Sequence, residues 1–290
     1  MEIAEKSYGP HSPEVATHLN NLAAVLYTSR RMDDAEPLMR RVMAIFEEAY
    51  GAEHPNVATS LNNLAGLLWN TGRLEEAEPL FRHALAIDEK SLGPKHPKIA
   101  LRLNNLAALL KDTNRLAEAE PLLRRALEVD EKSYGPDHPD VAIDLNNLGI
   151  LLQATSRLDE AEPLMRRAVE IFHKVYGDDH PTVASSLNNL AGLLYNTGRL
   201  AEAEPLMQRV QAIRERKLGP DNLDLVRDLN NRAMLLQHMG RLGESEPLMR
   251  RALAIFQNSL GPEHPNTITV RENLAALLRQ MGKNVEADKL

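Results

Sequence analysis

Five histidines recur at equivalent places in the chain, each directly before a proline, and a row of imidazoles suggests metal binding first. They are His54, His96, His138, His180 and His264. Imidazole is a common zinc ligand, but packed helices lie about 8–10 Å apart, which is too far for successive rings to share an ion bound at about 2 Å. We therefore expect these histidines to cap helices or to hydrogen-bond between repeats. We predict no metal site.

Other catalytic chemistry has no recognisable set of residues. The chain contains no cysteine. It also lacks the glycine-rich patterns that bind nucleotides and the GxSxG pattern of a serine nucleophile. Acidic and basic residues occur throughout, so no acid–base pair stands out. We predict that this chain is not an enzyme, and we assign it no catalytic residue and no cofactor.

Paired asparagines offer another chemistry, the recognition of a peptide backbone. Leu-Asn-Asn occurs, always 42 residues apart, at 19–21, 61–63, 103–105, 145–147, 187–189 and 229–231. A carboxamide has donors and an acceptor, so it can pair with the C=O and N–H of a peptide group whatever side chain that group carries. These asparagines are therefore candidate peptide-binding residues.

The elements that position the asparagines follow from one unit, residues 51–92. In its first half, Leu61, Leu64 and Leu68 recur at the three-and-four spacing of an amphipathic helix, and Pro55 stands near the start. The second half repeats the apolar spacing from Leu74 onward. Two short helices joined by a turn cannot bury their apolar faces alone, so the sequence predicts stacked copies.

Glycines mark the ends of these helices, and prolines occur inside the second helices. Gly72 separates the two helices, and Gly51 or Gly93 ends a second helix. Six prolines lie about one turn inside the second helices, where we expect a slight bend. They are Pro37, Pro79, Pro121, Pro163, Pro205 and Pro247.

A helical wheel places Asn63 opposite the leucine face of the first helix and Asn62 on its shoulder. The first amide row comprises Asn21, Asn63, Asn105, Asn147, Asn189 and Asn231, followed by Asn273 in the degenerate seventh copy. The second amide row comprises Asn20, Asn62, Asn104, Asn146, Asn188 and Asn230. We predict that both rows contact a peptide. The alternative is that they only hydrogen-bond between adjacent repeats.

Specificity is expected from positions that vary while the scaffold repeats. One such column comprises Thr17, Thr59, Leu101, Ile143, Ser185, Arg227 and Thr269. The aromatic residues Tyr27, Trp69 and Tyr195 stand in a second column and are candidate anchors, because exposed aromatic side chains dominate interface energetics. Simple packing on the next repeat is the alternative for these three.

The unit resembles the tetratricopeptide repeat. Leu61, Leu64, Gly72, Ala77 and Phe81 match its signature columns, and the string HPxVAxxLNNLAxLLxxxGRLxEAEPLxRRALAI is similar to the kinesin light chain type. The resemblance implies a right-handed superhelix whose first helices line a concave groove for extended peptides. Chaperone adaptors of this family grip a terminal carboxylate with lysines in the second amide row. No basic residue stands there, so an internal peptide segment is implied.

We predict an all-α fold, an α-solenoid of stacked antiparallel helix hairpins that forms a single array over residues 1–290. The predicted units are 9–50, 51–92, 93–134, 135–176, 177–218, 219–260 and a partial 261–290, with 1–8 as the end of a preceding helix. In the sixth unit, Asn222-Leu223 replaces His-Pro, which makes the last section of the groove less regular.

Net charge and hydropathy argue against two classes of binding partner. The net charge is −7, and basic residues are interspersed with acidic ones, so we predict no nucleic-acid partner. There is no apolar run of about 20 residues and no signal-peptide pattern, so we predict no membrane partner and a cytoplasmic location. The leading interpretation is a protein-interaction scaffold or adaptor. The alternatives are a structural array that self-associates end to end, and a sensor or regulatory region of a larger signalling protein.

Overall fold

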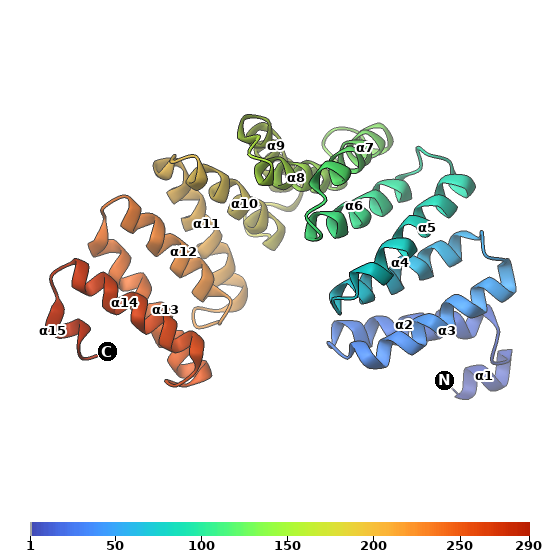
Figure 1. Cartoon of the computed structure of the whole chain (residues 1–290), viewed down its shortest axis with the longest axis horizontal. Helices are drawn as coiled ribbons and strands as arrows, with labels where there is room; N and C mark the ends of the chain where they lie inside the picture. Colours follow the sequence, from blue (N-terminus) through green and yellow to red (C-terminus); the bar gives the residue numbers. More distant parts are fainter. Residues whose placement is uncertain (1) are drawn as a thin grey trace. The chain divides into compact units, whose positions relative to one another are not determined.

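The structure, a computed structural model, describes residues 2–290, with side chains from Glu5 onward, and all its regular secondary structure in that range is helical. Contacts divide the chain into two compact units, unit 1 (Met1–Leu151) and unit 2 (Leu152–Leu290). Helix α8 (Pro139–Ala154) extends across the boundary between them. Figure 1 labels the helices in chain order. The all-α class predicted from the sequence is confirmed over the described residues.

Within unit 1 the helices before α8 are α1 (Glu2–Tyr8), α2 (Pro13–Thr28), α3 (Met32–Tyr50), α4 (Pro55–Asn70), α5 (Leu74–Leu92), α6 (Pro97–Asp112) and α7 (Leu116–Tyr134). Those of unit 2 are α9 (Leu158–Tyr176), α10 (Pro181–Asn196), α11 (Leu200–Leu218), α12 (Leu225–His238), α13 (Leu242–Leu260), α14 (Pro265–Gln280) and α15 (Asn284–Ala287). First helices, such as α4, alternate with second helices, such as α5. The single-array prediction and its repeat boundaries stay predictions.

Five first helices, α4, α6, α8, α10 and α14, begin at the proline of a His-Pro pair, and the histidine caps them. The Nδ1 atom of His54 accepts a hydrogen bond from the backbone N–H of Asn56 at 3.2 Å. The same bond recurs at the other four histidines of the row. A capping acceptor satisfies one of the unpaired N–H groups of the first turn. The capping interpretation is confirmed. Among the described residues, no group of three or more metal-ligating side chains could hold an ion.

The sixth unit shows what the His-Pro pair contributes. There Asn222 takes the place of the histidine, and its Oδ1 accepts a hydrogen bond from the backbone N–H of Asp224 at 2.9 Å. Without a proline to fix the first helical residue, α12 begins only at Leu225 and has 14 residues instead of 16. The substitution keeps a hydrogen bond to the residue two positions on, but the shortened helix has Asp224 as its N-cap residue, which makes no side-chain cap hydrogen bond.

Second helices run without a break through their prolines. Helix α5 extends over 19 residues with Pro79 inside it. A proline there removes the hydrogen bond to the carbonyl four residues earlier, which belongs to Glu75. Glu75 is exposed, so water can satisfy its carbonyl. This is why an interior proline is tolerated; the bend expected from the sequence stays a prediction.

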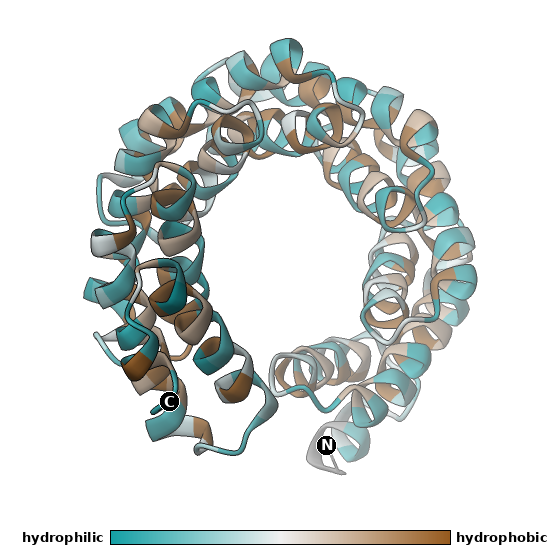
Figure 2. Cartoon of the chain, turned by 60° about the vertical axis from the view of Figure 1, so that its left-hand side comes forward, coloured by the Kyte–Doolittle hydropathy of each residue, from teal (hydrophilic) through white to brown (hydrophobic). Residues whose placement is uncertain are grey.

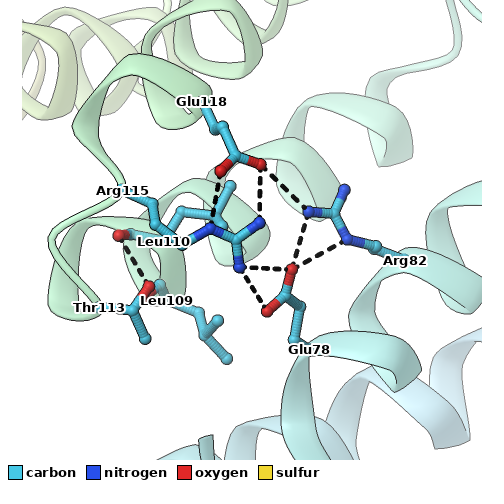
Figure 3. Close-up of polar contacts among 7 residues, drawn as sticks. All are labelled: Glu78, Arg82, Leu109, Leu110, Thr113, Arg115 and Glu118. Carbon is cyan, nitrogen blue, oxygen red and sulfur yellow. Dashed lines mark hydrogen bonds and ion pairs between the residues drawn. The ribbon is translucent and has the colours of Figure 1, made fainter. Parts of the chain in front are cut away.

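The turn between the two helices of a hairpin needs one residue with positive φ. Gly72 fills this position at φ +79°, a conformation that glycine adopts without steric cost. Equivalent turns use Arg30, Asn114 and Ser156 at about +60°. A threonine next to the turn binds the last carbonyls of the first helix: Thr113 Oγ1 donates to the carbonyl of Leu110 at 3.0 Å (Figure 3).

The helices carry both hydrophobic and hydrophilic residues along their length (Figure 2). In the second hairpin, Val57, Ala58 and Leu61 of α4 pack with Ala84 and Ile87 of α5, and all five are buried. Partly buried residues of the preceding helix α3 join this cluster. Equivalent clusters recur in the neighbouring hairpins of unit 1. Burial of each large side chain contributes about 1.5–3 kcal/mol, so stacking supplies what one hairpin lacks.

Candidate functional site

Both amide rows lie at the partly exposed surface of the first helices rather than in the core. The first-row residues Asn63, Asn105, Asn147, Asn189 and Asn231 are half-buried and Asn21 is exposed. The second-row residues Asn62, Asn104, Asn146 and Asn188 are half-buried. On the other side of α4, Leu61, Leu64 and Leu68 are at most 3% exposed. The helical wheel thus placed the asparagines on the correct side of the helix.

The two rows are joined to each other between adjacent hairpins of unit 1. A first-row Nδ2 donates to the Oδ1 of the preceding hairpin's second-row residue: Asn63 to Asn20 at 3.4 Å, Asn105 to Asn62 at 2.9 Å and Asn147 to Asn104 at 3.2 Å. These bonds confirm that the asparagines connect repeats. Besides this N–H, the carboxamides of Asn63, Asn105 and Asn147 each have a carbonyl oxygen and a second N–H. Ligand contact by this free capacity stays a prediction.

Hollows lie along the same face in each unit. In unit 1, Asn104 and Asn147 line a hollow of about 30 Å³ together with Lys111. In unit 2, Asn230 and Asn231 line a pocket of about 480 Å³ between α12 and α14. Residues of the amide rows therefore line a hollow in each unit.

The three candidate aromatic anchors bridge neighbouring hairpins. Trp69 is half-buried, and its Nε1 donates to Asp112 Oδ2 at 2.9 Å. The Trp69 ring meets Phe81 edge-on at 6.4 Å between centroids. Tyr27 OH accepts a hydrogen bond from Asn70. These contacts agree with the alternative that the aromatic side chains pack on the next repeat.

In unit 2, Tyr195 makes the equivalent bridge. Its OH lies 2.7 Å from His238 Nδ1, and the two rings meet edge-on at 5.5 Å. Tyr195 remains half-buried like Trp69 and Tyr27. All three rings are thus held in place while part of each stays accessible. Their role as anchors stays a prediction.

Sequence reasoning missed a ladder of ion pairs on the second helices. Arg115 bridges Glu118 of its own helix and Glu78 of the preceding hairpin, both at 2.7 Å. Arg82 pairs with the same Glu78 at 2.8 Å (Figure 3). Burial would raise the pKa of Glu78, but hydrogen bonds and charge from Arg115 and Arg82 outweigh it and hold that pKa below its ordinary value. The RLxEAE string, which recurs at residues 73–78, 115–120, 157–162 and 199–204, is the signal that could have revealed this bridge.

Sequence reasoning also missed a column of buried and half-buried side chains between consecutive hairpins. The column pairs a residue near the end of a second helix with one 14 positions later in the next first helix. Its pairs are Phe46 with Ser60, Asp88 with Arg102, Asp130 with Asp144, Phe172 with Ser186, Arg214 with Asp228, and Phe256 with Val270. Charged residues in a column otherwise filled by phenylalanine and small residues are the signal.

Two of the charged pairs are ion pairs. Asp88 is fully buried, Arg102 is 3% exposed, and Arg102 Nε lies 2.8 Å from Asp88 Oδ2. The guanidinium of Arg102 also donates to Thr59 Oγ1 at 3.2 Å. In unit 2 the order is reversed, with Arg214 on the second helix paired to the buried Asp228. A buried charge is stable only when paired in this way.

The third charged pair joins two carboxylic acids. Asp144 is fully buried and Asp130 is 5% exposed. Burial raises the pKa of Asp144 to about 8, with a hydrogen bond from Asn104 opposing it and the charges of Asp130 and Asp140 adding to it. Burial also raises the pKa of Asp130 to about 6. Near neutral pH, the two groups hold a proton that ordinary aspartates would release.

Over the described part of the chain, no helix is both long and apolar enough to span a bilayer.

Comparison with known protein families gives a match along the whole chain. The tetratricopeptide repeat model matches residues 1–48, 14–90, 57–132, 99–172, 145–216, 182–233 and 226–290. Among curated proteins, none matches the chain.

Solved structures are similar as well. A kinesin light chain-type protein of Podosopora anserina with nearly identical TPR-like repeats is 26% identical, with a TM-score of 0.61 over 71% of this chain and 97% of that one. BtubC (BKLC) from P. vanneervenii is 24% identical, with a TM-score of 0.66 over 85% and 94% of the two chains. The quorum sensor NprR from B. thuringiensis is 13% identical, with a TM-score of 0.72 over 99% and 78%. The last two likenesses concern the fold alone.

Proposed function

The chain belongs to the tetratricopeptide repeat family, whose fold is a general scaffold for protein interactions, and on this premise we propose that it binds an extended peptide or a partner helix along its two amide rows. It acts in this proposal as a scaffold or adaptor without enzymatic activity, in the cytoplasm. The observation that carries the proposal is the position of the amide rows, which lie half-buried at the surface of the first helices and are held there, in unit 1, by hydrogen bonds between adjacent hairpins.

The hydrogen bonds between the rows favour binding because they fix the asparagines in advance. Asn105 uses one N–H on Asn62, so its side chain is oriented before a partner arrives. Ordering a polar side chain on binding costs about 0.5–1.5 kcal/mol, and this cost is reduced where the side chain is already held. The remaining carbonyl and N–H of Asn105 suit the N–H and C=O of a peptide group.

The bridging aromatic side chains support the same proposal. Trp69 is held by Asp112 and Phe81, and Tyr195 is held by His238. A rigid, partly accessible ring offers a large apolar contact at a small loss of conformational entropy. We infer that apolar side chains of the partner pack on these rings while the amide rows bind its backbone.

The test is a selection of random display peptides against the purified chain, followed by affinity measurement. Replacing Asn105, Asn147 and Asn189 together by Ala should weaken the selected peptides at least about tenfold, since each lost backbone hydrogen bond is worth about 0.5–1.5 kcal/mol. Helicity by circular dichroism should stay nearly unchanged, because the three residues lie outside the core.

A matched control changes asparagines away from the rows. Asn56 and Asn258 are exposed and lie outside both amide rows. Their joint replacement by Ala should leave peptide affinity within about twofold of the wild type, as expected for surface substitutions. Equal affinity of the triple variant and the wild type for the selected peptides would rule out the amide rows as the binding surface.

A further inference from the structure

A pocket of about 600 Å³ lies in unit 1 among α6, α7 and α8, on the side where the first helices carry the amide rows. Its floor holds Asp130 from α7 and Asp144 from α8, and its walls include Leu101, Ile143 and Tyr134. Leu101 and Ile143 belong to the variable column from which specificity was expected. The pocket therefore adjoins the proposed peptide-binding face.

The two carboxyl groups on the floor have unused acceptors. Asn104 donates a hydrogen bond to Asp144 Oδ1. Asp144 Oδ2 and Asp130 Oδ1 are buried and have no hydrogen-bond partner. Among the side chains that the structure describes, no Lys, Arg or His forms an ion pair with either group. A buried acid without a partner costs free energy, so this floor favours a cation.

Equivalent positions of the same scaffold show which cation fits. Forty-two residues earlier, the place of Asp144 is taken by Arg102, whose guanidinium pairs with Asp88. Asp88 also keeps one oxygen without a partner, but its other oxygen receives this charge. In unit 2, Arg214 supplies a guanidinium from the other helix. The space between consecutive hairpins thus accepts a guanidinium opposite a buried carboxylate.

The walls of the pocket suit the rest of such a side chain. Leu101 is 54% exposed and Ile143 is 44% exposed, so both present apolar surface at the pocket. The Tyr134 ring stacks on His138 at 4.2 Å and is held there. An arginine can lay its aliphatic stem on such apolar surface while its charged head reaches a polar floor.

We propose that this pocket binds an arginine side chain of the partner peptide, whose guanidinium pairs with Asp130 and Asp144. The proposal rests on the proposed function, because it needs a peptide on the adjoining face. The planar fork of a guanidinium matches carboxylate oxygens better than an ammonium does. A metal ion is a poorer fit, because no group of three ligating side chains occurs among the described residues.

The two aspartic acids hold one more proton when no cation is bound than when a guanidinium is bound. Without a cation the buried pair retains a proton near neutral pH, because burial raises both pKa values. A guanidinium replaces that proton, which passes to the buffer. The other titratable or charged groups around the pair are His96, Lys98, Tyr134, His138 and Asp140.

The experiment titrates N-acetyl-arginine methylamide into the full chain, with N-acetyl-citrulline methylamide as the neutral isostere. Carbon-13 NMR of labelled aspartate carboxyls reports occupancy, and calorimetry in two buffers reports proton release. We expect citrulline to bind at least about tenfold more weakly, and arginine binding to release up to about one proton at pH 7. Equal binding of the two compounds would overturn the proposal.

Three variants test whether arginine binds in this pocket or is only attracted by the net negative charge of the protein. Asp144→Asn keeps the shape, removes a charge and should weaken arginine at least about tenfold. Asp144→Arg copies Arg102 and should abolish binding by occupying the pocket. Asp33→Asn makes the same charge change at an exposed residue of unit 1 that does not line the pocket and should change affinity by less than about threefold.

The two proposals fail in different ways. Arginine binding that persists in Asp144→Arg, or calcium chloride that shifts the same carboxyl resonances at lower concentration than arginine, would overturn the arginine pocket and leave peptide capture untouched. Selected peptides that ignore the amide-row variant would refute the proposed function, whatever the arginine compound does. Urea unfolding of each variant checks that the fold is kept.

Discussion

Two places in unit 1 have the same backbone surroundings and opposite electrostatics. Between α5 and α6, Asp88 meets Arg102, and both are nearly inaccessible. Between α7 and α8, Asp130 meets Asp144. The sites are 42 residues apart and differ mainly in whether the first helix supplies a guanidinium or a carboxyl. Repetition of the fold therefore does not repeat the charge balance at each junction of hairpins.

The comparison shows how one side chain decides whether a junction is complete or open. At the Asp88 junction, the guanidinium of Arg102 satisfies the acid and also reaches Thr59. At the Asp130 junction, the position equivalent to Thr59 is the exposed Leu101. The first junction is neutral and filled, whereas the second is acidic and bordered by a pocket.

The largest effect is expected when the filled junction is broken. Arg102→Met leaves Asp88 buried without its counter-ion, so the free energy of unfolding at pH 7 should fall by about 3–5 kcal/mol. Urea denaturation followed by circular dichroism measures it. The double variant with Asp88→Leu should recover stability to within about 1 kcal/mol of the wild type, since an apolar pair can replace a buried ion pair. A loss below 1 kcal/mol in the single variant would contradict the comparison.

An intermediate effect is expected from pH at the open junction. The folded-state pKa values of Asp130 and Asp144, about 6 and about 8, lie above the unfolded value. Between about pH 4 and pH 8 the folded chain then binds more protons than the unfolded chain, so the stability contributed by the pair is lost as pH rises. We expect a loss of roughly 1–3 kcal/mol between pH 5 and pH 8.

The variant Asp144→Asn sharpens this test because it cannot ionise. It should match the wild type near pH 5 and exceed its stability near pH 8. Arginines lower the pKa values of glutamates such as Glu36 and Glu78, so these glutamates remain ionised above pH 5. They do not contribute to the difference in stability between the variant and the wild type. Parallel pH profiles of the variant and the wild type would show that the acids are not protonated together.

The smallest effect is expected at the exposed ion pairs. Arg115 is about one-third exposed and Glu118 about half exposed, so water screens their attraction. Arg115→Ala should lower the free energy of unfolding by less than about 1 kcal/mol, and added salt should reduce the difference further. Thermal unfolding at low and high salt measures it. A loss as large as that of Arg102→Met would remove the distinction between exposed and buried pairs.

Most of the helical architecture could be predicted from the sequence, because leucine spacing and turn glycines are local signals. The spacing of Leu61, Leu64 and Leu68 located α4, and Gly72 located the turn after it. The same wheel placed Asn63 on the accessible side. These features depend only on residues within one helix and its nearest turn.

The junction chemistry could not be predicted from the same rules. Asp130 and Asp144 stand on different helices, and each alone resembles an ordinary solvated acid. Only the packing of α7 against α8 makes them neighbours with raised pKa values. The start of α12 at Leu225 was also not predicted, because the bond from Asp224 N–H to Asn222 does not make Asn222 the N-cap residue of the helix.

The bridge made by Arg115 has a consequence for how disturbances spread. Because one guanidinium holds a glutamate of its own hairpin and another of the preceding hairpin, opening of either hairpin removes a contact from the other. Such nearest-neighbour coupling makes adjacent hairpins exchange their amide hydrogens together rather than singly. The number of hairpins that open together is limited by the junction with the weakest contacts. A change of charge at one junction would therefore change that number.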